Sequence, residues 1–243
     1  MFKRTLDISL ALIGLIAFSP LLLVVTFLVW IQDYHSPFYI PPRVGQNNTT
    51  FYMVKLRSMV MNADKSGVDS TSSNDQRITA VGRFIRKCKL DEITQLWNVL
   101  LGDMSLVGPR PNVKRETDLY TSVEQKLLTV KPGITDFSSI VFSDEGEILK
   151  DHLDPDIGYN QLIRPWKSAL GIFYIEHQNF ILDVQLIFLT VIAIFSRENA
   201  LLGVTKLLKK YNASQELISV SSRVKALVPS PPPGTTEIIT KRA

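Results

Sequence analysis

Cysteine and histidine are scarce in this chain of 243 residues. Cys88 is the single cysteine, so no intramolecular disulfide can form and a cysteine-based metal cluster is excluded. The three histidines, His35, His152 and His177, are scattered and lack the spacing of metal ligands. An unpaired cysteine is typical of a reducing compartment, so we expect the chain to face the cytosol.

The common nucleotide-binding motifs are also absent. The chain contains no G-x-x-x-x-G-K-[ST] and no G-x-G-x-x-G pattern, which argues against P-loop and Rossmann phosphate sites. The formal charge of +4 and the pI of about 9.1 suit an anionic partner such as a phosphate or a lipid headgroup. The basic residues lack an aromatic-rich face, so we expect no nucleic acid ligand.

Charge is missing altogether from the apolar run Ile8–Ile31. About 20 such residues can cross a bilayer as a helix. Lys3 and Arg4 favour a cytoplasmic N-terminus. Ser19-Pro20 lies in the middle of the run, where proline removes a backbone donor and bends a helix. The run is either a kinked spanning helix or a re-entrant one. We favour re-entry, because spanning would place a large region with one unpaired cysteine outside the cytosol.

Short β-prone runs follow the apolar helix. Ser36–Ile40 and Thr50–Leu56 enclose the turn-rich segment Pro41–Asn48, and together they predict a β-hairpin with a long turn. The polar segment Asn62–Gln76 predicts a mobile loop, either a lid or a disordered connection. The basic segment Ile78–Lys89 is either a solvated helix face or a phosphate site. Its basic residues include Arg83, Arg86, Lys87 and Lys89.

The stretch Leu90–Pro111 combines an acid pair, an amphipathic segment and a rigid loop. Asp91 and Glu92 open it, at a helix start whose free N–H groups and dipole favour ionised carboxylates. Apolar residues then recur at a spacing that places them on one helical face. These residues are Ile93, Leu96, Trp97, Leu100 and Leu101. Gly102 fits the left-handed conformation that ends a helix.

The acid pair admits two interpretations. Adjacent helical residues point about 100° apart, so Asp91 and Glu92 cannot share one proton and can take separate tasks. A carboxylate kept ionised by nearby cations such as Arg86 suits nucleophilic attack or metal binding. The structural alternative is a pair of plain helix-start acids.

Arginines supply the matching candidates for phosphate binding. Arg110 stands between Pro109 and Pro111, where a planar fork gains from a backbone that cannot flex. A structural salt bridge is the alternative for Arg110. Arg43 and Arg57 flank the predicted hairpin and are further candidates.

The C-terminal half is less informative. Val113–Lys131 and Trp166–Gln178 predict helices. Phe180–Phe195 is short for a span and predicts a helix on a protein or membrane surface. The acidic loop Val141–Tyr159 contains Asp154-Pro155-Asp156, a D-x-D pattern with which many nucleotide-sugar glycosyltransferases hold a divalent ion.

Several motifs occur together in a recognisable order. They are Lys3-Arg4-x-x-Asp7, Ser19-Pro20, Pro42-Arg43-x-Gly45, Lys55-Leu56-Arg57-Ser58-Met59, Leu90-Asp91-Glu92, Asp103-Met104-Ser105-Leu106-Val107-Gly108-Pro109-Arg110-Pro111 and Lys131-Pro132-Gly133-Ile134-Thr135. The combination resembles the bacterial sugar transferase family, the monotopic polyprenyl-phosphate phosphoglycosyl transferases. The resemblance covers roughly residues 2–200, and the block from Leu90 to Pro111 is its most specific part.

The resemblance implies an enzyme at the bacterial inner membrane. It would transfer a sugar-1-phosphate from a UDP-sugar to undecaprenyl phosphate, release UMP and require Mg²⁺. It implies that Asp91 is the nucleophile of a covalent phospho-sugar intermediate, and that Glu92 helps to bind the metal or to activate the acceptor. Arg86 and Arg110 would hold phosphates. Arg43 and Arg57 would lie near the site.

The implied fold is α+β, mainly helical and monotopic, with a small β-hairpin. Residues 1–35 would form a membrane-embedded re-entrant helix broken at Ser19-Pro20. Residues 36–200 would form the cytosolic catalytic domain. Beyond the resemblance, we expect residues 201–243 to form a basic extension. It loses periodicity from about Ser221, and the proline-rich run from Ser230 predicts a disordered tail.

The chain also departs from the family pattern. Asp136-Phe137-Ser138-Ser139 follows Thr135 where the family commonly has Gly-Trp and a glutamine, and Gly171 stands where it usually has an aspartate. The donor sugar therefore stays open, as does the oligomeric state, with a homodimer among the alternatives. Two other functions stay open: a D-x-D glycosyltransferase, which would release UDP, and a non-catalytic membrane-anchored scaffold.

Overall fold

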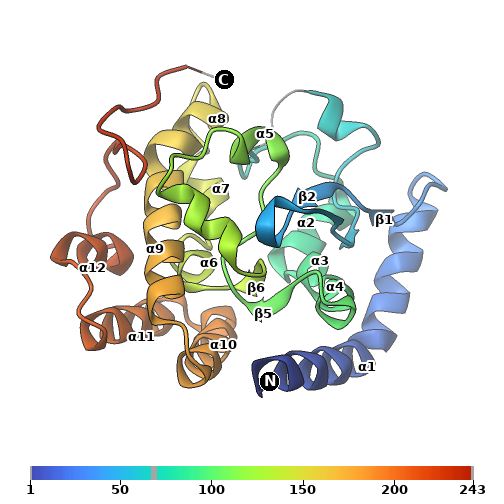
Figure 1. The fold of residues 1–243 in the computed structure, drawn as a ribbon. Coiled ribbons are helices and arrows are strands. Elements are labelled where there is room, and N and C mark those ends of the chain that lie inside the picture. Colours follow the sequence, from blue (N-terminus) through green and yellow to red (C-terminus); the bar gives the residue numbers. More distant parts are fainter. Residues whose placement is uncertain (1, 67–69, 242–243) are drawn as a thin grey trace.

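The structure is a computed structural model and describes residues 2–66 and 70–241. Helices dominate these residues, and three two-stranded sheets lie among them (Figure 1). This confirms a mainly helical fold with small sheets. Part of the predicted mobile loop, residues 67–69, lies outside the described residues.

The elements follow one another with short connections. The helices are α1 (Phe2–Ile31), α2 (Ala80–Lys87), α3 (Leu90–Ile93), α4 (Leu96–Leu101), α5 (Lys114–Thr117), α6 (Phe137–Val141), α7 (Glu145–Ile148), α8 (Pro155–Gly158), α9 (Arg164–His177), α10 (Phe180–Phe195), α11 (Arg197–Lys210) and α12 (Gln215–Ser222). Shorter helical turns are η1 (Gln46–Asn48), η2 (Ala63–Ser66), η3 (Glu124–Thr129) and the π-helical η4 (Tyr159–Ile163). The strands are β1 (Phe38–Tyr39), β2 (Pro42–Val44), β3 (Thr50–Tyr52), β4 (Lys55–Leu56), β5 (Ser105–Val107) and β6 (Gly133–Thr135).

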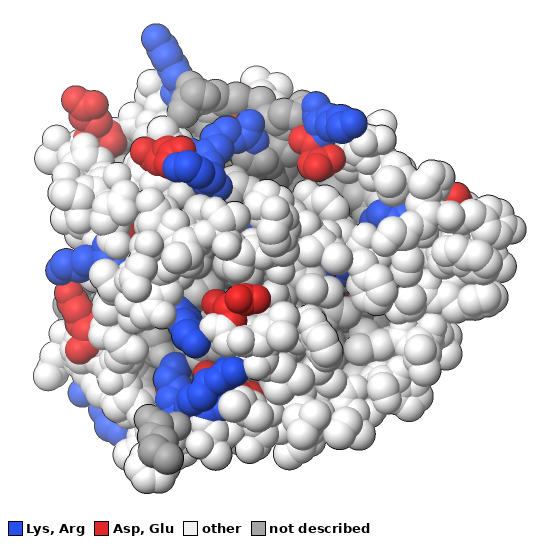
Figure 2. All heavy atoms as spheres, turned by 45° about the vertical axis from the view of Figure 1, so that its right-hand side comes forward, with Lys and Arg blue, Asp and Glu red and all other residues white. Residues whose placement is uncertain are grey.

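The predicted apolar helix is α1, which is long and apolar enough to cross a membrane. It stays helical through Pro20 and bends partway along its length (Figure 1). The Ser19 hydroxyl donates to the carbonyl oxygen of Ile16 at 2.8 Å, one turn back. Most of the helix surface is exposed, and much of the face in Figure 2 carries few charged side chains. Its length and exposed apolar surface are consistent with membrane association.

The first turns of α1 are anchored to the rest of the chain. Lys3 Nζ lies 2.6 Å from Asp183 Oδ2 on α10. Arg4 donates to two carbonyl oxygens at the end of α4, where helix carbonyls lack intrahelical partners. Asp7 is buried and accepts from the Leu106 amide of β5 at 3.0 Å. The charged motif that precedes the apolar run is therefore an anchor for the helix.

The second half of α1 packs on a different part of the same body. Val25 and Val29 are buried in a small apolar cluster with Leu56 of β4, Ile85 of α2 and Leu90 of α3. Since both halves of the bent helix contact the body, α1 wraps along one side of it (Figure 1).

The predicted hairpin exists, but its turn is shorter than expected. β2 pairs with β3, and β1 pairs with β4, so one antiparallel ribbon runs through both pairs. Pro42–Val44, which we placed in the turn, is a strand. Proline is tolerated at its first residue because that position needs no N–H donor. The observed turn is η1, between Gly45 and Thr49.

The predicted helix after Leu90 is wrong in detail, because it is divided into α3 and α4. Within α4, Asn98 points inward, where its side chain accepts from the Val54 amide at 2.9 Å and donates to the Tyr52 carbonyl at 2.7 Å. Trp97 is 52% exposed, so the predicted apolar face is not buried as a whole. The Gly102 C-cap is confirmed, with φ of 94°.

The parallel pair β5–β6 fixes the loop that carries Arg110. Gly108 and Gly133 lie so close that a Cβ on Gly133 would approach the Gly108 nitrogen to 2.1 Å. Only glycine fits this contact. The backbone that enters the proline-flanked loop is therefore held by main-chain contact with β6.

The C-terminal half contains one confirmed prediction and several corrections. α10 has the bounds that we predicted. The expected helix Val113–Lys131 is wrong, because only α5 and η3 form there. The acidic loop is interrupted by α7 and α8, and the expected helix Trp166–Gln178 is α9, shifted by two residues at its start.

The region after residue 200 is packed against the body. The boundary that we placed at residue 200 falls inside α11, which contributes buried Val204 and Leu208 to the main core. Beyond α12 the chain forms no helix or strand as far as residue 241. There the amide of Ser230 donates to the carbonyl oxygen of Gln161 at 3.0 Å.

Candidate active site

A cleft of about 960 Å³ opens between the β-ribbon, α2, α3, the loop after β5, and the helices α6, α7 and α9. All six polar site residues suggested by the sequence line it. These are Arg43, Arg57, Arg86, Asp91, Glu92 and Arg110. Segments far apart in the sequence thus bring two carboxylates and four arginines to one cleft.

Asp91 lies in the first turn of α3, with its side chain 14% exposed. Its Oδ2 lies 3.2 Å from Nζ of Lys55 on β4. Lys55 was not among our candidate residues, although it begins the motif that runs to Met59. That motif is the signal that could have identified it. The lysine provides a fixed positive charge beside the predicted nucleophile.

Glu92 points to a different cation. Its Oε1 lies 3.3 Å from Arg110 Nη1, and the same nitrogen donates to the Ile134 carbonyl at 2.7 Å. Burial alone would lower the pKa of Arg110. The nearby carboxylates of Glu92 and Asp136 stabilise the charged guanidinium and outweigh burial, so the pKa of Arg110 is raised above its ordinary value. The neighbouring acids have separate partners, as expected from their divergence along a helix.

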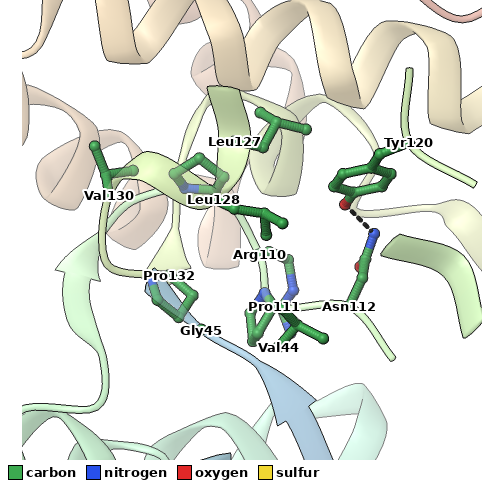
Figure 3. A pocket seen from close by; sticks show the side chains of 11 residues that line it. Val44, Gly45, Arg110, Pro111, Asn112, Tyr120, Leu127, Leu128, Val130 and Pro132 are labelled. Carbon is green, nitrogen blue, oxygen red and sulfur yellow. Dashed lines mark hydrogen bonds between the residues drawn. The ribbon is translucent and has the colours of Figure 1, made fainter. Parts of the chain in front are cut away.

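Packing holds the backbone around Arg110. Figure 3 shows Pro111 and Pro132 near Val44 of the hairpin, around a small cavity of about 10 Å³. Beside them the Asn112 amide donates to the Tyr120 hydroxyl at 2.8 Å. The guanidinium therefore projects from a backbone with little freedom to move.

Arg86 approaches the site from α2. Its Nε donates to the Ser58 hydroxyl at 2.9 Å. Burial lowers its pKa, while the nearby Asp91 carboxylate acts in the opposite direction. A Cβ on Gly82 would clash with the Ser58 carbonyl at 1.9 Å, so glycine allows α2 to press against this strand end. That contact positions Arg86 near Asp91.

Arg57 lines the cleft, but its guanidinium is engaged elsewhere. It pairs with Asp33 through two contacts of 2.5 and 2.6 Å, and its Nε donates to the Ser36 carbonyl at 2.8 Å. Hydrogen bonds from Arg57 lower the pKa of Asp33 to about 2. This pairing makes Arg57 a clamp between the end of α1 and β4. Arg43 on β2 also lines the cleft.

The D-x-D residues have structural partners. Asp154 caps α8 by accepting from the Asp156 and Ile157 amides. Asp156 accepts from the Ser70 amide at 2.8 Å. Neither aspartate is among the residues that line the cleft. This geometry gives the D-x-D hypothesis no support.

The acid pair suits a magnesium ion. Mg²⁺ is usually held by one or two carboxylates, with waters and substrate phosphates completing its octahedron. Asp91 and Glu92 both open to the cleft and could supply those carboxylates. Among residues 2–66 and 70–241, no group of three or more His, Cys, Asp or Glu side chains is placed to hold a metal.

The far wall of the cleft was not identified from the sequence. It includes Asp136, Ser138, Ser139 and, from α9, Lys167. Asp136 caps α6 by accepting from the Ser139 amide at 2.8 Å, and burial raises its pKa. The departure from the family pattern after Thr135 therefore lies on a cleft wall.

Comparison with known proteins gives a consistent result. Residues 1–197 match the family described as bacterial sugar transferase. The exopolysaccharide production protein ExoY of Sinorhizobium fredii is 33% identical over 207 residues, which cover 79% of this chain and 84% of that protein.

Two longer proteins are also similar. The UDP-N-acetylgalactosamine-undecaprenyl-phosphate N-acetylgalactosaminephosphotransferase of Aeromonas hydrophila is 32% identical over 70% of this chain and 42% of its own length. The undecaprenyl-phosphate galactose phosphotransferase of Salmonella typhimurium is 43% identical over 55% of this chain and 31% of its own. The chain thus spans less than half of each. It belongs to the bacterial sugar transferase family and is a homologue of undecaprenyl-phosphate sugar phosphotransferases.

Proposed function

We propose that this protein transfers a sugar-1-phosphate from a UDP-sugar to undecaprenyl phosphate and thereby initiates a membrane-linked glycan such as an exopolysaccharide. The names of its relatives supply the substrate classes. The observation that carries the proposal is the acid pair, which shares one cleft with Lys55, Arg86 and Arg110 beside a long apolar helix.

In the first step, a carboxylate oxygen of Asp91 attacks the phosphorus that bears the sugar. A bond forms between this oxygen and phosphorus, and the bond from phosphorus to the bridging oxygen breaks. UMP leaves with that electron pair. The product is a phospho-sugar ester on Asp91. In the second step, a phosphate oxygen of undecaprenyl phosphate attacks the same phosphorus, and the Asp91 carboxylate leaves.

The surrounding cations make this attack feasible. A carboxylate that approaches a diphosphate meets like charge, and fixed positive groups offset the repulsion. In this proposal Lys55 orients Asp91, and Arg86 and Arg110 hold phosphate oxygens. Their positions on the walls of the same cleft support these roles. Glu92 and Asp91 would hold Mg²⁺, which would supply further charge neutralisation.

We infer further that α1 is re-entrant and that the cleft faces the cytosol. Lys3 and Asp7 bind the first turns of α1 to the body, and Val29 packs the last turns on the same body. A helix with both ends on one body returns to the side from which it entered. This packing supports re-entry over a full span, and the basic N-terminus supports the cytosolic side.

Substitution of the nucleophile tests the mechanism. In the Asp91→Asn variant, we expect UMP release from a UDP-sugar with undecaprenyl phosphate and Mg²⁺ to fall to background, because an amide cannot form the ester. Asp118→Asn is the matched control, since Asp118 is exposed, pairs with Lys114 one helical turn away and does not line the cleft. Full UMP release by Asp91→Asn would refute the mechanism. Release of UDP in place of UMP would refute the reaction class.

A further inference from the structure

β1 brings an aromatic side chain close to the predicted nucleophile. In the register of the β1–β4 pair, Tyr39 lies directly opposite Lys55. Opposite residues of an antiparallel pair project from the same face of the sheet. Lys55 reaches Asp91 from that face, so the Tyr39 side chain stands beside the lysine that contacts the nucleophile. Tyr39 lines the cleft and is 38% exposed.

The same strand follows directly on the apolar helix. Trp30, in the last turn of α1, stacks edge-on against Tyr34 with ring centroids 5.3 Å apart, and both rings are exposed. Exposed tryptophan and tyrosine at the end of an apolar helix are typical of a membrane interface. β1 begins four residues after Tyr34, so a short stretch of chain connects these rings to Tyr39, which pairs with the lysine that contacts Asp91.

Arg57 fixes that arrangement. Its side chain holds Asp33 after α1 and the Ser36 carbonyl before β1, and its amide donates to the Pro37 carbonyl at 2.8 Å. The connection from the membrane helix to β1 is thereby tied to the end of β4. The position of Tyr39 relative to α1 is set by these contacts.

The chemistry of this edge of the cleft is apolar and basic. Phe38 and Tyr39 both line the cleft and expose aromatic surface. Lys55 and Arg86 line the same cleft. The far wall is instead formed by hydroxyl, carboxylate and ammonium groups. An apolar edge that leads to fixed cations complements a ligand with an isoprenoid chain and a phosphate head.

We propose that Tyr39 is an acceptor-positioning residue, whose ring receives the first isoprene units of the polyprenyl phosphate and directs its phosphate toward Asp91. This inference rests on the proposed function. In the second step, an acceptor phosphate oxygen forms a bond to phosphorus while the bond to Asp91 breaks and the carboxylate is restored. Tyr39 takes part only by holding the acceptor in line.

Separate measurement of the two half-reactions tests the assignment. With a UDP-sugar and no acceptor, Tyr39→Ala is expected to form the Asp91 adduct and release UMP at the wild-type rate. With undecaprenyl phosphate, its KM for the acceptor is expected to rise about tenfold, as expected for loss of most of an aromatic contact. Tyr39→Phe keeps the ring and should restore the acceptor KM. Tyr52→Ala is the matched control, because Tyr52 lies on β3, is 65% exposed and does not line the cleft.

The outcomes separate the two proposals. An unchanged acceptor KM in Tyr39→Ala would overturn the assignment. A slower donor half-reaction would also overturn it and would place the ring against the nucleotide. If the wild-type protein forms no adduct with any UDP-sugar, the proposed function fails, and the acceptor assignment fails with it.

Discussion

Arg110 uses one nitrogen, Nη1, for two acceptors, the Glu92 carboxylate and the Ile134 carbonyl. Lysine carries the charge but not the planar fork, so it cannot keep both contacts and still offer a second nitrogen to phosphate. Charge-assisted hydrogen bonds contribute about 1.5–3 kcal/mol each. We expect Arg110→Lys to lower kcat/KM for the UDP-sugar roughly tenfold to a hundredfold, measured by UMP release.

The thermal unfolding temperature of the same variant provides the control. Since lysine keeps the charge beside Glu92, we expect the fold to persist with only a small shift. The exposed Arg115 on α5 offers a matched Arg→Lys change outside the residues that line the cleft. Equal rates for Arg110→Lys and the wild type would contradict a phosphate-binding role for the fork.

At the scale of residues, the candidates that the structure brings to one cleft include those that a short motif holds together in the sequence. Asp91 and Glu92 are adjacent in sequence, and Pro109 and Pro111 mark Arg110 directly. Lys55 was missed because its role depends on how β4 lies against α3, a contact between segments far apart in the chain. The engagement of Arg57 with Asp33 likewise depends on where α1 ends.

At the scale of elements, the ion pair between Asp33 and Arg57 joins the end of α1 to β4, and its strength depends on pH because the Asp33 carboxylate can be protonated. Arg57 lowers the pKa of Asp33 from 3.8 to about 2. Between pH 2 and pH 3.8, the unfolded state therefore binds more protons at Asp33 than the native state does. The ion pair stabilises the fold above pH 3.8 and loses its effect as the pH falls toward 2. We expect Asp33→Asn to lower the unfolding temperature at pH 7, with a difference from wild type that shrinks below pH 4.

A scan of unfolding temperature against pH in one detergent measures this effect. Asp118→Asn serves again as the control, because its exposed pair with Lys114 should contribute little at any pH. A difference that stays constant from pH 7 to pH 3 would mean that the charge of Asp33 is not what holds the connection.

Helices were predicted correctly where contacts close in the sequence determine them, and less well where contacts with distant segments do. α10 was found at its exact bounds because Asn179 caps its start and the apolar run ends at Phe195. The stretch after Leu90 was read as one helix because its apolar spacing is helical throughout. At the division, the Thr94 hydroxyl donates to the carbonyl oxygen of Val54, a contact with a distant segment that no local pattern contains.

At the scale of the whole molecule, α1 shows why the overall arrangement could not be deduced from periodicity. Its apolar length predicted a membrane helix, and Ser19-Pro20 predicted a bend. The partners of its two halves, Asp183 for Lys3 and Leu56 for the region of Val29, lie in distant segments. The cleft also depends on contacts between distant segments, because each of its walls comes from a different part of the chain.

The region after the family match completes the core of the molecule. α11 and α12 bury several side chains in the main cluster, among them Leu201, Val204, Leu208 and Leu217. Burial of one such side chain contributes about 1.5–3 kcal/mol, whereas a whole domain is stable by only about 5–15 kcal/mol. A chain that ends after Phe195 is therefore expected to aggregate or to lose its cooperative unfolding transition in detergent. A chain that ends after Ser222 keeps both helices and should unfold near the wild-type temperature. A stable, active protein that ends at Phe195 would show that the core up to α10 is sufficient.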